Sequence, residues 1–291
     1  MSLVIAIGIA TGCVYAIIAM GYSLLYRTTG VVNFAQGSFV VIGGLGTYFF
    51  RSVVGLPYPL AVVCGILLTG IVALAFWVLI IVPLWRRNSA PYVTLLSTVV
   101  MAALLGNLTH LLLSPDPQTL PPWLPGFTLQ LAGTQIAGQY VVVVVVALAM
   151  IGLTAWYLQA SATGRAMRAV AASRPTSRLL GIDPERVGGT AMLIAGLLAG
   201  VGGALITPAQ LTSPDQGLLY GVFGFVAAVI GGLGSLRGAL IGGLIVGVLQ
   251  TLIVRYISAN FEMVIVFALL LVLLTVRPRG LFGVAEFEVA H

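Results

Sequence analysis

Residues 141–151 read Val-Val-Val-Val-Val-Val-Ala-Leu-Ala-Met-Ile, an unbroken apolar run inside a longer apolar stretch at 139–159. A helix needs about 20 such residues to cross roughly 30 Å of hydrocarbon. Because backbone polar groups in lipid need internal partners, only helices and closed barrels span membranes. A barrel strand would alternate apolar and polar residues, and this run does not. The run therefore predicts a helix that crosses a membrane.

The composition of the whole chain also indicates a lipid environment. Of the 291 residues, 60% are hydrophobic and 7% are charged, and the mean hydropathy is +1.13. Soluble domains keep roughly a quarter of their residues charged. This chain has too few polar groups to cover a water-facing globule. We expect an all-α fold, a polytopic transmembrane helical bundle that forms a single membrane domain over residues 1–291.

Apolar runs of spanning length recur along the chain. They lie at 3–25, 36–50, 58–84, 91–113, 139–159, 187–208, 220–254 and 261–276. The run at 220–254 is too long for one crossing, and the glycine-rich stretch 231–238 interrupts it, so we expect two passes joined by a tight turn at Arg237. The chain then has eight or nine hydrophobic segments. Those at 36–50 and 220–233 are short, and either could be a re-entrant or broken helix.

The arginines predict which loops face the cytoplasm. All 13 basic residues are arginine, and cytoplasmic loops carry an excess of basic residues. Three groups stand out: Arg86 with Arg87; Arg165, Arg168, Arg174, Arg178 and Arg186; and Arg277 with Arg279. The proline-rich stretch 114–139 carries Asp116 and no arginine or lysine, so it should face outward. If all nine segments cross, the N-terminus is outside and the C-terminus is cytoplasmic.

Several functional classes lack the residues that they require. The chain contains no lysine, so it cannot form a Walker A loop, and any ATP must bind to another chain. His110 and His291 are isolated, and no spacing typical of a metal site occurs. Cys13 and Cys64 lie in apolar runs and are expected to be reduced. We expect no catalytic residues, no cofactor and, since the arginines are dispersed, no nucleic-acid partner.

The loop at about 160–186 is expected to fold into short helices on the cytoplasmic side. Thr163 is placed to cap a helix over 164–172, and a second helix is expected over 175–180, with Gly181 ending it. Asp183 is placed to cap the next span. This loop is either an interfacial segment that arginines anchor to anionic lipid, or a docking surface for a cytoplasmic partner. The apolar anchors of such a surface would be Met167, Leu179 and Leu180.

Polar residues and glycines within the apolar segments are candidates for the translocation pathway. Asn33 and Gln36 open the second segment, and polar groups at membrane depth are costly unless they have partners. They could serve the pathway or simply form structural hydrogen bonds. Gly231, Gly232 and Gly234 could mark broken helices that line the pathway. Alternatively, the Gly-x-x-x-Gly spacings of the chain serve close helix packing.

Four parts of the chain together resemble the branched-chain amino acid ABC importer permeases. They are residues 12–22 with 31–37, residues 164–171 with 177–183, residues 227–243, and residues 271–283. In combination and order these stretches are specific, and they cover nearly the whole chain. The N-terminal part is more similar to the H-type subunit, the first permease of the pair, than to its longer partner. Gln36 departs from the pattern, since similar proteins often carry histidine there.

The resemblance implies a permease subunit that forms a translocation pathway by alternating access in the bacterial inner membrane. It implies a heterodimer with a second related permease, two cytoplasmic ATP-binding subunits and an extracytoplasmic substrate-binding protein. The matching coupling positions are Gly164, Arg165, Arg168, Gly181 and Ile182. The alternative is a self-standing channel or ion-coupled carrier for a small polar solute such as urea or an amide. That alternative needs intramembrane acids or histidines, which the spans nearly lack.

Overall fold

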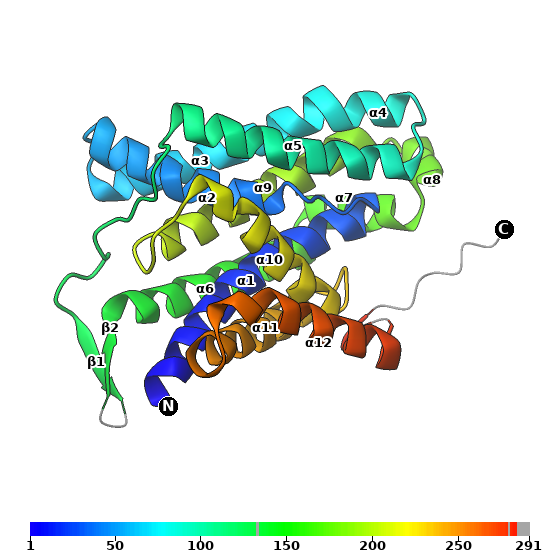
Figure 1. Ribbon diagram of the computed structural model, residues 1–291. Helices are drawn as coiled ribbons and strands as arrows, with labels where there is room; N and C mark the ends of the chain where they lie inside the picture. Colours follow the sequence, from blue (N-terminus) through cyan, green and yellow to red (C-terminus); the bar gives the residue numbers. More distant parts are fainter. Residues whose placement is uncertain (132–133, 279, 284–291) are drawn as a thin grey trace.

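The computed structural model describes residues 1–131, 134–278 and 280–283. Over these residues the chain is a bundle of long helices (Figure 1). The longer helices are α1 (Ser2–Thr29), α2 (Gln36–Tyr48), α3 (Tyr58–Phe76), α5 (Pro91–Leu112), α6 (Gly138–Ala160), α9 (Pro184–Ile206), α10 (Gly217–Gly231), α11 (Leu236–Tyr256) and α12 (Glu262–Val276). The shorter elements are η1 (Phe49–Val53), η2 (Trp77–Ile81), α4 (Val82–Arg86), α7 (Ala162–Ala172), α8 (Arg174–Leu179), η3 (Pro214–Gln216), η4 (Ala259–Phe261) and the strands β1 (Thr128–Leu131) and β2 (Thr134–Ala137).

The helices confirm the expected apolar segments. Eight helical stretches among the described residues are long and apolar enough to cross a membrane, judged by length and composition alone. The run at 220–254 divides as expected, into α10 and α11. The turn lies slightly earlier than expected, because Gly232 and Gly234 adopt φ of 100° and 86° and Ser235 caps α11 by accepting a hydrogen bond from the Gly238 amide. Arg237 therefore lies in the first turn of α11.

The short segment at 36–50 lies in the centre of the bundle. Twelve of the 13 residues of α2 are buried, packed against α3, α9 and α10. The π-helical η1 continues α2 to Val53. At about 1.5 Å per residue this helix is roughly 27 Å long, close to the thickness of the hydrocarbon core. Its closing part, η1, contains no buried residue.

The proline-rich stretch contains a hairpin that the all-α expectation missed. Strands β1 and β2 pair antiparallel, with Thr128 opposite Ala137 and Leu129 opposite Ile136. A further bridge pairs Gln118 with Thr212, between α9 and α10. The signal in the sequence is short, because only four residues per strand alternate, between a run of prolines and an apolar helix. The hairpin is an addition to the helical bundle and leaves the fold class unchanged.

The two ends of the bundle differ in their elements. Figure 1 shows the end of α4, the helices α7 and α8, and the end of α12 at one end, and the β1–β2 hairpin at the opposite end. Two of the predicted arginine groups and Arg277 of the third therefore share one end of the bundle, and the stretch without arginine occupies the other. Arg279 lies outside the described residues. The arrangement agrees with the sidedness that the arginines predict.

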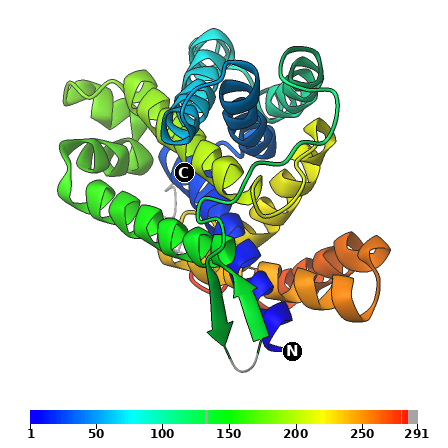
Figure 2. The same cartoon turned by 90° about the vertical axis from the view of Figure 1, so that its left-hand side faces the viewer.

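Glycines allow α1 and α11 to pack with their backbones in contact. A Cβ atom at Gly247 would lie 2.2 Å from the Cα of Gly12, and one at Gly243 would lie 2.4 Å from the amide nitrogen of Ala16. Gly8 faces the Cα of Val248 in the same way, at 2.9 Å. Helices in lipid associate through close packing of this kind rather than through the hydrophobic effect. These glycine spacings therefore serve helix packing. Figure 2 shows α1, in dark blue, crossing the bundle beside α11.

Candidate coupling surface and adjoining cleft

Serine side chains define the two short helices of the 160–186 loop. The Ser161 hydroxyl accepts a hydrogen bond from the Gly164 amide at 3.1 Å, so Ser161 caps α7 and the expected cap, Thr163, lies within the helix. The Ser173 hydroxyl caps α8 by accepting from the Thr176 amide. Since serine is a strong N-cap, α8 begins at Arg174, one residue before the expected start. Gly181 follows with φ of 77°, as a stop requires.

The loop continues into α9 through the expected cap. Asp183 accepts a hydrogen bond from the Glu185 amide at 2.9 Å. Its other carboxylate oxygen lies 3.2 Å from Nε of Arg186. The negative charge stands at the positive end of the α9 dipole, where it is stabilising. The sequence prediction for the start of α9 is confirmed.

One face of α7 packs onto the membrane helices. Met167 is 4% exposed and Val170 is 2% exposed. A Cβ atom at Gly164 would lie 1.8 Å from the carbonyl oxygen of Leu158 at the end of α6. The burial of Met167 weighs against its expected role as an apolar anchor for a partner, because its side chain packs against its own chain. Gly164 is a packing residue for the same reason.

Arg174 attaches α8 to the bundle. Its guanidinium lies 3.8 Å from the centre of the Trp85 ring and donates a hydrogen bond to the carbonyl oxygen of Thr29, the last residue of α1. Trp85 in turn meets Trp77 edge-on, with ring centres 5.0 Å apart. Burial, and then repulsion by Arg178, lower the pKa of Arg174. A single arginine thus connects α8 to α1 and α4.

At the same end of the bundle, an ion pair joins α4 to α9. Nη2 of Arg86 lies 2.8 Å from Oε2 of Glu185, and Nε of Arg86 donates to both carboxylate oxygens at 3.2 and 3.1 Å. The indole Nε1 of Trp77 donates to the Glu185 carbonyl at 3.0 Å. Bidentate arginine–carboxylate geometry is the strong form of such a pair. The start of α9, where the loop ends, is therefore fixed relative to α4.

An Arg174→Gln substitution should loosen α8. Loss of the stacked cation removes a contact of ~1 kcal/mol, so we expect the amides of α8 to exchange with deuterium about fivefold faster. The measurement is hydrogen–deuterium exchange of the purified protein, read on peptides that cover α8. Arg178→Gln is the matched control, because Arg178 is exposed in the same helix. Equal exchange in the two variants would show that Arg174 does not hold the loop.

The opposite face of the loop is exposed and partly apolar. Leu179 and Leu180 are 88% and 72% exposed, and Arg165 and Gly181 are also exposed. Ile182 is half-buried and lines an open depression with Arg86, Arg178, Gly181, Asp183, Pro184 and Glu185. We call Arg165, Leu179, Leu180, Gly181 and Ile182 the coupling surface. These predicted positions lie on or beside the exposed side of the loop.

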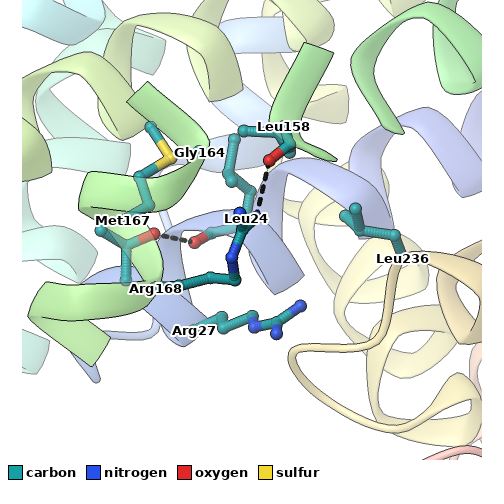
Figure 3. A pocket seen from close by; sticks show the side chains of 8 residues that line it. Leu24, Arg27, Leu158, Gly164, Met167, Arg168 and Leu236 are labelled. Carbon is teal, nitrogen blue, oxygen red and sulfur yellow. Dashed lines mark hydrogen bonds between the residues drawn. The ribbon is translucent and has the colours of Figure 1, made fainter. Parts of the chain in front are cut away.

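Arg168 is exposed but lies elsewhere. Its Nη1 donates to the Leu158 carbonyl at 2.8 Å, and its side chain enters a cleft between α1, α6 and α11 at the arginine-rich end of the bundle (Figure 3). The sequence groups Arg168 with Arg165, since both belong to the matched motif. The structure gives them different surroundings: Nη1 of Arg165 donates to the Ala160 carbonyl at 3.1 Å, and Arg165 does not line the cleft that Arg168 enters.

Asn33 and Gln36 are held inside the bundle. The Asn33 side chain accepts from the Ala35 amide at 3.1 Å and donates to the sulfur of Met192 at 3.7 Å. Nε2 of Gln36 donates to the Ala195 carbonyl at 3.0 Å, and its Oε1 is buried without a partner. Both side chains thus connect the start of α2 to α9. This arrangement favours the structural-hydrogen-bond alternative over a pathway role.

Other segments of the same chain pack against the turn between α10 and α11. A Cβ atom at Gly231 would lie 2.1 Å from the Gly238 carbonyl oxygen. The amides of Leu281 and Phe282 donate to the carbonyls of Ile230 and Gly231, each at 2.9 Å. A Cβ atom at Gly234 would lie 3.6 Å from the Cβ of Arg27. In this structure Gly231, Gly232 and Gly234 form a packed turn, which favours packing over the pathway alternative.

A polar chain near the opposite end was not predicted as a unit. The Tyr15 hydroxyl donates to Oε1 of Gln250 at 2.7 Å, and Nε2 of Gln250 donates to Oε2 of Glu262 at 3.1 Å. The three residues come from α1, α11 and α12, so no sequence spacing reveals them. These hydrogen bonds give Glu262, an acidic residue at the start of α12, a partner in Gln250. Among the described residues, no group of three or more His, Cys, Asp or Glu side chains is placed to hold a metal ion.

Comparisons with known proteins cover nearly the whole chain. The sequence model of the family described as branched-chain amino acid transport system / permease component matches residues 4–274. The chain is 34% identical to the high-affinity branched-chain amino acid transport system permease protein LivH of Salmonella typhimurium, over 97% of this chain and 95% of that protein. The LivH proteins of Escherichia coli K12 and Methanocaldococcus jannaschii, the latter named as probable, are 33% and 30% identical, over 97% and 92% of this chain and 95% and 88% of theirs. No solved structure matches this chain significantly.

Proposed function

The chain belongs to the branched-chain amino acid transport permease family, and we propose that it moves branched-chain amino acids across the membrane by alternating access. The observation that carries this proposal is the coverage: the family resemblance extends over the whole bundle, from α1 to α12. It is a multi-pass membrane protein and the transport subunit of an ABC transporter. Its substrate is inferred from the names of relatives that match over 95% of their length.

The proposed partners would carry out the steps for which this chain lacks the residues. The chain has no lysine and so no Walker A loop. Two cytoplasmic ATP-binding subunits would supply ATP hydrolysis, a second related permease would complete a heterodimer, and an extracytoplasmic binding protein would deliver the amino acid. The coupling surface supports the first of these partners, because Leu179 and Leu180 expose apolar area beside an open depression. ATP-driven closure of the ATPases would move α7 and α8.

The proposed location is the bacterial inner membrane, with the C-terminus in the cytoplasm. Its support is the placement of α4, α7, α8 and the end of α12 at one end of the bundle (Figure 1). These elements carry or adjoin most of the arginines, and positive charge accumulates on the cytoplasmic side. Residues 284–291 lie outside the described part of the chain.

Affinity purification from native membranes tests the assembly. The tagged chain in mild detergent should bring with it a second permease and ATP-binding subunits, identified by mass spectrometry. In reconstituted vesicles the complex should take up radiolabelled leucine, isoleucine or valine only with ATP on the cytoplasmic side and the binding protein on the other. A stable homo-oligomer that is recovered alone and transports without ATP would contradict the proposal and indicate a channel or carrier.

A further inference from the structure

The cleft that Arg168 enters is built from four elements at the arginine-rich end of the bundle. We call it the arginine cleft. The space in it that a water-sized molecule can occupy is about 40 Å³, and the cleft is open to solvent. Its main lining residues are Leu24 and Arg27 of α1, Leu158 of α6, Met167 and Arg168 of α7, and Leu236 of α11. Figure 3 shows the side chains of Arg27 and Arg168 in this cleft, with the apolar side chains around them.

Neither arginine of the cleft has an acidic partner within residues 1–131, 134–278 and 280–283. The ion pairs among the described residues join Arg86 to Glu185, Arg186 to Asp183 and His110 to Asp215, so the acids nearest in sequence to the loop are already engaged. One hydrogen bond of Arg168 goes to the Leu158 carbonyl, and the aliphatic part of Arg27 packs on the α10–α11 turn. Two guanidinium groups therefore share an apolar cleft, with donors left over and no anion beside them from the part of the chain that the structure describes.

The position of the cleft matches the headgroup level of a membrane. Trp156 and Tyr157, directly before Leu158 on α6, are 65% and 39% exposed. Exposed aromatic residues of this kind collect at the membrane–water interface. Farther along α6, toward the other end, Leu148 and Leu153 are 45% and 55% exposed. The exposed face of α6 therefore offers an apolar surface that suits acyl chains, and Trp156 and Tyr157 lie at the end of this face that is nearest to Leu158 in the sequence.

We propose that the arginine cleft binds the phosphate group of an anionic phospholipid of the cytoplasmic leaflet, with the acyl chains along the exposed face of α6. Guanidinium groups bind phosphate oxygens through paired hydrogen bonds. Basic pockets between membrane helices on the cytoplasmic side suit anionic headgroups. The shared chemistry would also admit inorganic phosphate, but the leucine and methionine walls favour an amphiphile. A bound lipid would fill the space between the cytoplasmic ends of α1, α6 and α11 and support α7.

Native mass spectrometry of the purified, delipidated complex tests this site. With phosphatidylglycerol added, we expect one lipid retained per copy of this chain, and no comparable retention of zwitterionic phosphatidylcholine. A variant with both Arg27→Gln and Arg168→Gln should bind phosphatidylglycerol at least about tenfold more weakly, since two charge-assisted phosphate contacts are lost. Arg165→Gln, on the same helix but outside the cleft, should bind as the parent does. Thermal melting of each complex checks that it is folded.

Four results would overturn the proposal. Equal affinity of the double variant and the parent for phosphatidylglycerol would mean that the lipid binds elsewhere. Equal affinity for phosphatidylcholine, or full competition by inorganic phosphate at the concentration of the lipid, would remove the anionic lipid as the ligand. Loss of the ATP-binding subunits from the double variant, with lipid binding unchanged, would assign the cleft to the ATPase. Because lipid retention is measured directly, the result does not depend on the transported substrate.

Discussion

A Gly247→Leu variant is expected to reach the membrane and to lose the native packing of the bundle. The Cβ of any residue at 247 would lie 2.2 Å from both the Cα and the amide nitrogen of Gly12, and 2.8 Å from the Gly8 carbonyl oxygen. These are backbone atoms, so no change of rotamer relieves the overlap and the two helices must separate. Overpacking a core costs ~1–3 kcal/mol, and a clash with backbone belongs at or above the upper end of that range.

The loss of packing should be measurable on the protein purified in detergent. Each spanning helix satisfies its own backbone hydrogen bonds, so insertion should persist while association of α1 with α11 fails. We expect the melting temperature of the purified protein to fall by about 5–10 °C, with broadening of its gel-filtration peak. Gly152→Leu on α6 is the matched control, because no atom lies within 4 Å of a Cβ at that exposed position. Similar melting of both variants would show that the α1–α11 contact does not hold the bundle together.

The spans were predictable because lipid imposes one rule along the whole chain. The long apolar runs predicted the spanning helices, and the glycines at 231–238 predicted the break between α10 and α11. Boundaries were less predictable. Ser161 and Thr163 are both good caps, and only the formed helix shows that the Gly164 amide points at Ser161. The hairpin β1–β2 was missed because its short alternation lies in a proline-rich stretch.

The site was predictable in place but not in detail. The motif located the loop, yet it did not separate the face that packs from the face that is exposed. The spacing of Gly164, Met167 and Val170 by three residues is the signal that was available, since such residues share one side of a helix. Contacts between distant segments left no such signal. Arg174 with Trp85 and Leu281 with Ile230 join residues whose neighbours in sequence do not indicate each other.

Substituting both leucines of the coupling surface by aspartate should abolish transport while leaving the permease folded. Leu179 and Leu180 are 88% and 72% exposed, so the bundle loses no contacts when they change. Burial of one leucine contributes ~1.5–3 kcal/mol. If both enter a groove of the ATP-binding subunit, Leu179→Asp with Leu180→Asp removes that energy and adds two charges that must be desolvated. Initial ATP-dependent uptake into vesicles should fall at least about tenfold, with loss of the ATP-binding subunits on purification.

The control must separate docking to a protein from anchoring to lipid, because exposed leucines near a membrane serve either purpose. Ala171→Asp, at an exposed position of α7, adds a charge to the same loop without removing an apolar side chain, and it should transport normally. A Leu179→Ala, Leu180→Ala variant should lie between the aspartate variant and the parent, since it removes apolar area but no charge opposes docking. If the aspartate variant retains the ATP-binding subunits and transports at the parental rate, then the two leucines contact lipid. The coupling contact would then lie at Arg165 or in the depression beside Ile182.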